Sequence, residues 1–190
     1  MMRDDPRRFT ILTVCSGNIC RSPAAALLLD DVLGTRGVIA SSAGTIARPG
    51  LPISPEIAQL LADDGVPSYR FASRPLTERL IADADLILAL AREHRSRVVS
   101  LVPAALRRTY TLKEFARLAS AVPATVLVDV PRTARERLLN LTALAARFRT
   151  PVPRGADDVE DPFGRSLADY RTAYAEIHEA VATIAELAQG

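Results

Sequence analysis

A cysteine and an arginine, Cys15 and Arg21, are the side chains whose spacing points most directly to chemistry. The five residues between them are Ser16, Gly17, Asn18, Ile19 and Cys20. A loop of this kind that enters a helix directs backbone N–H groups at one centre and adds the positive end of the helix dipole. The planar guanidinium of Arg21 suits two oxygens of a phosphate. The segment therefore predicts an oxyanion-binding loop.

Cys15 lies at the rim of this predicted loop. The positive field that holds a phosphate also stabilises a thiolate, which is the nucleophilic form of cysteine. The chemistry that fits is phosphoryl transfer through a cysteinyl-phosphate. The alternative is that Cys15 is a small buried residue and Arg21 a surface charge. The glycine and asparagine in the turn, between a strand and a helix, favour the catalytic interpretation.

The elements around the loop are predicted to place it at the edge of a sheet. Residues 9–14 are rich in β-branched side chains, which indicates a buried strand. After the loop, Ser22 is predicted to cap a helix over residues 24–33, with Pro23 at its first position. Because ligands of open α/β sheets bind beyond the carboxyl ends of strands, this is a favourable place for a site.

The rest of the chain alternates between strand and helix patterns. Further strands are predicted at 38–42, 85–90 and 108–112. Further helices are predicted at 54–64, after Thr77, and at 92–101, 113–119, 131–148 and 166–187. This alternation favours a parallel sheet. The predicted fold is α/β and doubly wound, with a four-stranded parallel sheet flanked by helices. One domain over 1–190 is expected, with an extra helical insertion around 120–150.

The loop resembles the phosphate-binding loop of low-molecular-weight protein tyrosine phosphatases, whose fold is shared by thiol-dependent arsenate reductases. The resemblance rests on Cys15, Gly17, Asn18, Ile19, Cys20, Arg21, Ser22 and Pro23. It implies that Cys15 is the nucleophile and that Arg21 binds the phosphate. It also implies that residues 16–20 surround the phosphate and that the Ser22 hydroxyl donates to the Cys15 sulfur.

A second match to the same family is Asp161, followed by Pro162, Phe163 and Gly164. It resembles the family's Asp-Pro loop, so Asp161 is expected to be the general acid and then the general base. A tyrosine phenolate, with a pKa near ~10, leaves slowly unless it is protonated. Phe163 is expected to line the ring side of the pocket. The alternative is that Asp161 is only a turn residue before the last helix.

Asp157, Asp158 and Glu160, just before Asp161, are interpreted as solvated neighbours. A third match lies in the segment 41–45, where the family's serine binds the asparagine of the phosphate loop; Ser42 is the candidate partner of Asn18. The alternative there is an ordinary turn at a strand end.

Several residues depart from the family pattern or carry weaker expectations. The segment 45–50 lacks the aromatic residue often found there and has Ile46 and Arg48 instead. The resemblance implies that Cys20 can form a reversible disulfide with the nucleophile, which would protect a reactive thiolate from irreversible oxidation; the alternative is a packed residue at the helix start. His94 is interpreted as part of a solvated helix face rather than a catalytic group, and His178 as a surface or helix-packing residue.

Composition excludes several classes of protein. The chain has 190 residues, of which 48% are hydrophobic and 24% charged, which is the composition of an ordinary globular protein. Its net charge is only +2, so it lacks the excess of basic residues that is typical of a nucleic-acid binder. With two cysteines and two histidines, a structural zinc site is not expected. No cofactor, signal peptide or membrane span is expected, which favours the cytoplasm.

The leading hypothesis is a protein tyrosine phosphatase that acts on phosphotyrosine in a protein substrate, without a metal, and that also holds phosphate or another oxyanion. One alternative is an arsenate reductase that uses an external low-molecular-weight thiol, since the chain has a single spare cysteine. Another is a phosphotyrosine-binding module without catalysis.

Overall fold

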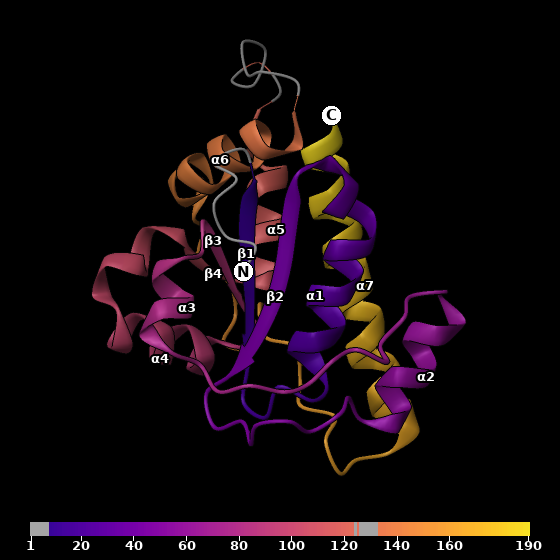
Figure 1. Ribbon diagram of the computed structural model, residues 1–190. Helices are drawn as coiled ribbons and strands as arrows, with labels where there is room; N and C mark the ends of the chain where they lie inside the picture. The colour runs from indigo at the N-terminus through magenta and orange to yellow at the C-terminus, as the bar shows by residue number, and fades with distance from the viewer. Residues whose placement is uncertain (1–7, 124, 126–132) are drawn as a thin grey trace.

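The computed structural model describes residues 8–123, 125 and 133–190. Its centre is a parallel sheet of four strands in the order β2-β1-β3-β4 (Figure 1). The strands are β1 (Phe9–Cys15), β2 (Val38–Gly44), β3 (Leu86–Ala89) and β4 (Thr109–Thr111). All four predicted strands are present, and the predicted doubly wound α/β fold is confirmed.

Helices connect the strands and cover both faces of the sheet (Figure 1). In chain order the helical elements are α1 (Arg21–Leu33), η1 (Gly34–Arg36), α2 (Pro55–Asp63), α3 (Glu78–Ala82), α4 (Arg92–Leu101), η2 (Pro103–Arg108), α5 (Leu112–Ser120), α6 (Ala134–Leu144), η4 (Ala145–Phe148) and α7 (Leu167–Gln189). No helix in the described ranges is both long enough and apolar enough to span a bilayer. The predicted lack of a signal peptide concerns residues 1–7, which lie outside the described residues.

Side chains of β1 point alternately to the two faces of the sheet, and each face is covered by its own apolar cluster. Phe9, Ile11 and Cys15 belong to the larger apolar cluster, to which α1, α5, α6 and α7 contribute. Leu12 and Val14 belong to the smaller cluster, with residues of α3 and α4. Side chains of successive strand residues point to opposite faces, so β1 is buried on both sides. That burial fixes the position of Cys15 at its end.

The strand order changes direction at β1, because β2 pairs on one side of it and β3 on the other. In doubly wound sheets this arrangement opens a crevice beyond the carboxyl end of the strands. The segment between Cys15 and Arg21 leaves β1 at that point, and α1 begins there (Figure 1). The topology thus places the predicted loop at the site where such folds bind ligands.

The helix starts predicted at Ser54 and Thr77 are confirmed, and the cap predicted at Ser22 is wrong. Ser54 accepts a hydrogen bond from Ile57 N at the start of α2, and Thr77 accepts one from Leu80 N at the start of α3. Ser22, however, is not the cap of α1, which already begins at Arg21. Its hydroxyl is used by the neighbouring loop, a tertiary contact that outweighs its capping preference.

The helical insertion is shorter than the sequence pattern suggests. Instead of one helix over 131–148, the chain forms α6 from Ala134 and then a 3₁₀ turn from Ala145; residues 131 and 132 of that prediction lie outside the described residues. Leu138 and Leu141 are buried in the larger cluster, and Arg137 Nε donates to Leu187 O of α7 at 3.2 Å. Figure 1 places α6 at the end of the sheet opposite the loop after β1. The insertion extends the core.

Candidate active site

The loop after β1 is built around Asn18, which has φ 55° and is the one non-glycine residue with positive φ among the described residues. Asparagine tolerates this left-handed conformation better than most residues. Its Nδ2 donates to Ser22 Oγ at 2.9 Å and to Ser42 Oγ at 2.8 Å, and its Oδ1 accepts from Arg74 N at 2.9 Å. These three buried or half-buried hydrogen bonds hold the turn, and they bring Ser42 to Asn18.

The sulfur of Cys15 lies where donors converge. Ser22 Oγ is 3.0 Å from Cys15 Sγ, and Asn18 N donates to the sulfur at 3.3 Å. Both residues are buried, so the contacts are shielded from water. With Cys15 as a thiolate, Ser22 is the donor in this pair, since a thiolate only accepts. The surroundings therefore suit a negatively charged sulfur.

Arg21 is buried and joins the loop to a segment far along the chain. Its Nη1 donates to Val159 O at 3.0 Å, and its Nη2 lies 2.6 Å from Asp161 Oδ2. Its Nε is buried and finds no acceptor among the described residues. A buried guanidinium retains its charge and prefers all its donors to be used. The free Nε donor is consistent with a phosphate oxygen as its partner.

The Asp-Pro segment brings Asp161 and Phe163 to the same place. The Asp161 side chain is 46% exposed and its Oδ1 accepts from Phe163 N at 3.3 Å. With Arg21, they line a cavity of about 370 Å³ beside the loop. The cavity is lined by Cys15, Ser16, Gly17, Ile19, Cys20, Arg21, Ile46, Arg48, Leu51, Asp161 and Phe163. Cys15 and Arg21 are buried, whereas Ile46 and Phe163 are exposed, so the polar groups form its floor and apolar groups its rim.

Cys20 is chemically distinct from Cys15. Both cysteines are free and buried. Burial raises the pKa of Cys20 to about 11, although a hydrogen bond with Ser54 opposes the shift. Cys20 is therefore a neutral thiol at physiological pH and a poor nucleophile compared with a thiolate. This leaves Cys15 as the nucleophile that the site can offer.

The prediction that His94 is a surface residue is wrong. His94 is 2% exposed, and its Nε2 lies 2.8 Å from Ser16 Oγ in the loop. Burial lowers its pKa to about 4, and the nearby charge of Arg21 acts in the same direction. The ring faces the loop because α4 starts at the end of β3, beside β1. Charged residues surround His94 in the chain, so its burial could not be expected from its neighbours. His178, in contrast, is exposed.

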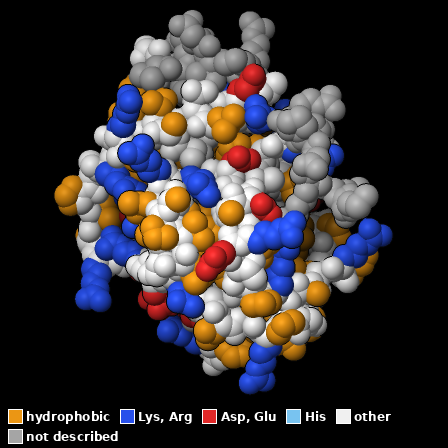
Figure 2. All heavy atoms as spheres, turned by 60° about the vertical axis from the view of Figure 1, so that its left-hand side comes forward, with side chains coloured by type: hydrophobic (Ala, Val, Ile, Leu, Met, Phe, Trp, Pro, Cys, Tyr) orange, Lys and Arg blue, Asp and Glu red, His pale blue; other side chains and the backbone are white. Residues whose placement is uncertain are grey.

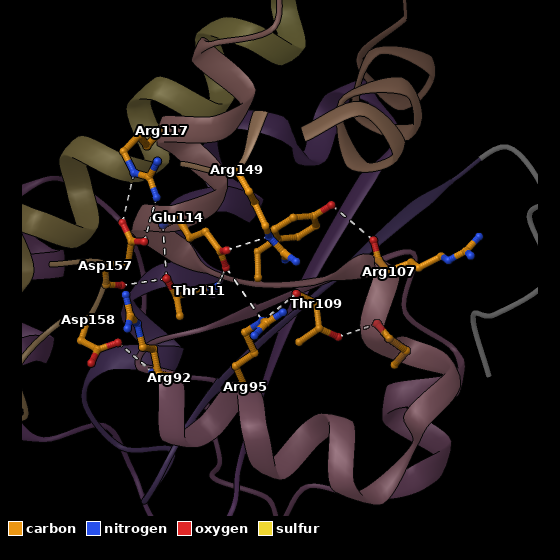
Figure 3. Close-up of polar contacts among 12 residues, drawn as sticks. Arg92, Arg95, Arg107, Thr109, Thr111, Glu114, Arg117, Arg149, Asp157 and Asp158 are labelled. Carbon is orange, nitrogen blue, oxygen red and sulfur yellow. Dashed lines mark hydrogen bonds and ion pairs between the residues drawn. The ribbon is translucent and has the colours of Figure 1, made fainter. Parts of the chain in front are cut away.

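The prediction that Asp157 is solvated is also wrong, whereas Asp158 is half-buried. Asp157 is buried and paired with Arg117 of α5, and Asp158 Oδ1 accepts from Arg92 N at 2.8 Å (Figure 3). Glu160 is exposed and pairs with Arg165, so that part of the interpretation is confirmed. A run of acidic residues has no periodicity that marks which of them turn inward. Partners at distant positions of the sequence decide it.

Among the described residues, the positive charge of the site comes from protein groups and not from a cluster of metal-binding side chains. No group of three or more histidine, cysteine, aspartate or glutamate side chains that could hold a metal ion occurs in the part of the chain that the structure describes. The positive charge facing the loop comes from Arg21, the backbone N–H groups and the start of α1. This arrangement can hold a phosphate, attack it with sulfur and deliver a proton from Asp161.

Comparisons with known proteins point in the same direction. A family model described as low molecular weight phosphotyrosine protein phosphatase matches residues 10–131. The chain is 28% identical over 178 residues to a protein-arginine-phosphatase of Bacillus subtilis, covering 93% of this chain and 94% of that protein. It is 37% identical over 114 residues to a probable low molecular weight protein-tyrosine-phosphatase, EpsP, of Ralstonia nicotianae, covering 60% and 77%.

The fold is similar to that of the YwlE arginine phosphatase from Geobacillus stearothermophilus, with a TM-score of 0.70 and 29% identity; the match covers 94% of this chain and 91% of that one. The family model spans more than half of the sequence, including Cys15, Arg21 and Ser42. The match to EpsP covers more than two thirds of that protein. The chain belongs to the low molecular weight phosphotyrosine protein phosphatase family.

Proposed function

We propose that this protein hydrolyses phosphotyrosine in protein substrates through a cysteinyl-phosphate, with Cys15 as nucleophile, Arg21 as phosphate clamp and Asp161 as general acid and base. The observation that carries the proposal is the double contact of buried Arg21 with Val159 O and Asp161. It brings the acid to the loop that holds the Cys15 sulfur. Nucleophile, clamp and acid thereby line one cavity.

In the first step the Cys15 thiolate attacks phosphorus with an electron pair of Sγ, and the bond between phosphorus and the phenolic oxygen breaks. That oxygen receives the bonding electrons and takes a proton from the Asp161 carboxylic acid. Arg21 and the loop N–H groups stabilise the charge on the equatorial oxygens of the transition state. Residues 16–20 and Ser22 support this geometry.

In the second step the Asp161 carboxylate takes a proton from water as the water oxygen attacks phosphorus. The bond between sulfur and phosphorus breaks and returns its electron pair to Cys15 Sγ. The contact of Ser22 Oγ with the sulfur stabilises this departing thiolate. Inorganic phosphate leaves, and Asp161 is again protonated for the next cycle.

The rim of the cavity favours an aromatic leaving group. Ile19, Ile46, Leu51 and Phe163 offer an apolar surface to a flat ring. Arg48, also at the cavity, disfavours a second cation such as a guanidinium through like-charge repulsion. These contacts support phosphotyrosine as the substrate.

Phosphoarginine in proteins is a second candidate substrate. It is favoured by the similarity to a protein-arginine-phosphatase over 93% of the chain, compared with 60% for the similarity to EpsP. The reaction would use the same sulfur and clamp, with cleavage of a bond between phosphorus and nitrogen. Arsenate reduction with an external thiol and phosphotyrosine binding without turnover remain alternatives from the sequence.

The setting proposed for this activity is the cytoplasm, where thiols stay reduced. Free Cys15 and Cys20 are consistent with it.

A regulatory disulfide between Cys15 and Cys20 stays a prediction, as does a single domain over 1–190. A nucleic-acid partner is not proposed, because the net charge is only +2; on the face turned forward in Figure 2, basic side chains are interspersed with acidic and apolar ones.

The proposal is tested by turnover of p-nitrophenyl phosphate, a phosphotyrosine peptide and a phosphoarginine peptide, with reductant and chelator present. Cys15→Ser should lose all turnover, because the hydroxyl is a far weaker nucleophile. Wild-type kcat/KM should be at least about tenfold higher for phosphotyrosine than for phosphoarginine, which corresponds to about 1.4 kcal/mol of discrimination. The reverse preference would establish the second candidate, and full activity in Cys15→Ser would exclude the cysteinyl-phosphate.

A further inference from the structure

The segment that leads into Asp161 is attached to α5 by a bidentate ion pair. Arg117 Nε lies 3.2 Å from Asp157 Oδ1, and Arg117 Nη2 lies 2.9 Å from Asp157 Oδ2 (Figure 3). The Asp157 side chain is only 9% exposed. Two parallel contacts between guanidinium and carboxylate fix orientation as well as distance. Asp157 is therefore held in one position by a helix that takes no part in the phosphate loop.

Backbone contacts hold the same segment on two sides. Thr111 Oγ1, at the start of α5, donates to Asp157 O at 2.7 Å. On the other side, Val159 N donates to Leu90 O, just after β3, at 2.8 Å. Asp158 Oδ1 accepts from Arg92 N at the start of α4. The segment 157–159 thus lies in a fixed register between α5 and α4 (Figure 3).

The anchored segment ends directly at the catalytic groups. Val159 O accepts from Arg21 Nη1, and Asp161 follows two residues later. The carboxylate of Asp161 contacts Arg21 Nη2 and Phe163 N, both within the site itself. Nothing in these two contacts sets how far the segment extends along the sheet edge. That distance is set by the contacts of the segment 157–159, of which the ion pair with Arg117 is the one that begins it.

We propose that Arg117 is a positioning residue for the proton transfer, which acts through Asp157 to hold Asp161 at the distance that the leaving oxygen requires. The inference rests on the proposed function of Asp161 as general acid. Without Arg117, the nearly buried Asp157 carboxylate loses its cation and is driven toward water. The segment then shifts, and Asp161 shifts with it.

A residue that only stabilised the fold would affect all substrates alike, whereas a residue that positions the acid affects those that need a proton. Phenyl phosphate releases a phenol with a pKa near ~10 and depends on the acid. p-Nitrophenyl phosphate releases a more stable phenolate and depends on it far less. The ratio of kcat/KM for these two esters therefore separates the two roles, since kcat/KM includes the departure of the phenol.

The experiment compares this ratio in wild type, Arg117→Met and Asp157→Asn. In both variants we expect kcat/KM for phenyl phosphate to fall about tenfold or more. This loss is a part of the roughly 10²–10⁴-fold rate enhancement that a general acid supplies. For p-nitrophenyl phosphate we expect kcat/KM to fall by less than about threefold. Arg117→Lys keeps the charge with one donor group and should restore part of the loss. The matched control is Arg149→Met, which removes an arginine that contacts Glu114 of the same helix at 3.1 Å; its ratio should equal that of wild type.

Equal losses on both esters, or none, in Arg117→Met and Asp157→Asn overturn the proposal. Asp161→Asn serves as the reference. It should show the same selective loss, and Arg117→Met should add little to it, since two changes to one step are not additive. If Asp161→Asn slows both esters equally, the acid assignment in the proposed function is wrong, and this is a separate outcome. Should Arg117→Met not fold, Asp157→Asn and Arg117→Lys test the same pair.

Discussion

The buried imidazole ring of His94 contacts the phosphate loop, and its protonation affects the stability of the whole protein. Its Nε2 contacts Ser16 Oγ, and its Nδ1 has no partner within the described residues. A neutral ring tolerates this environment, whereas a protonated ring would leave a buried N–H without an acceptor. The lowered pKa of His94 follows from that burial.

We expect His94 to make the protein less stable as the pH falls. The unfolded chain takes up a proton near pH 6.5, the ordinary value, and the folded chain only near pH 4. Between these values the unfolded state binds more protons, so stability is full above pH 6.5 and is lost as the pH falls toward 4. From pH 7 to pH 5, wild type should lose about 1–2 kcal/mol more of its unfolding free energy than His94→Asn.

Urea unfolding at pH 7 and pH 5 measures this difference, with His178→Asn as the control. His178 is more than half exposed, so its replacement controls for the loss of a histidine that is not buried. Parallel pH profiles for wild type and His94→Asn would contradict the assignment of the acid sensitivity to His94.

At the scale of elements, the end of β2 and the phosphate loop approach so closely that only a glycine fits between them. A Cβ on Gly44 would lie 2.9 Å from Asn18 Cβ and would overlap the carbonyl oxygen of Ser16. Thr45 N and Ile46 N donate to Cys15 O and Ser16 O just beyond it. The loop is therefore shaped partly by the strand beside it.

Gly44→Ala should displace the loop and lower kcat/KM for p-nitrophenyl phosphate by roughly tenfold or more, because displacements of about 1 Å at a reacting centre cost up to ~10²-fold. Steady-state kinetics checks this, with thermal unfolding to verify the fold. Gly34→Ala is the control, since Gly34 has φ −59° and its nearest neighbour atoms would be 3.6 Å away. It should keep wild-type kinetics; normal kinetics in Gly44→Ala as well would show that the loop adapts to the methyl group.

The elements themselves could be predicted because their signals are local. Strand 9–14 is marked by β-branched residues, and α2 and α3 by Ser54 and Thr77 at their caps. Ser22 carried the same signal and was used differently, since its hydroxyl lies between Asn18 and Cys15. A capping preference worth about 1 kcal/mol is easily outweighed by buried tertiary hydrogen bonds.

Across the whole molecule, the insertion and the site lie at opposite ends of the sheet, so they should respond to mutation separately. Leu138 of α6 is fully buried. Leu138→Ala should lower the unfolding free energy by about 2–5 kcal/mol, through lost burial and the cavity it leaves. At temperatures where the variant stays folded, its kcat/KM should equal that of wild type.

The neighbouring Leu139 is 38% exposed and provides the matched control. Leu139→Ala should change the unfolding free energy by no more than about 0.5 kcal/mol. Denaturant unfolding and steady-state kinetics on both variants test this separation. A loss of activity in folded Leu138→Ala would mean that α6 influences the site after all.

Contacts between residues that lie far apart in the sequence could not be predicted from the sequence alone. The motif around Cys15 and the Asp-Pro segment were recognisable from adjacent residues. The inward turn of Asp157 and of His94 was not, because each depends on a partner, Arg117 or Ser16, that is distant in sequence. Both residues stand in charged stretches that are typical of solvent-exposed surfaces, and only the packed sheet and helices reverse that expectation.

The bond between Arg21 and Val159 joins residues 138 positions apart. During synthesis Cys15 and Arg21 therefore leave the ribosome long before Val159 and Asp161. Domains fold largely as units, and distant contacts form late. A nascent chain that ends before Val159 would lack the acceptor of Arg21 Nη1 and the proposed acid, so we expect esters that need a proton to be hydrolysed only after Asp161 has been made.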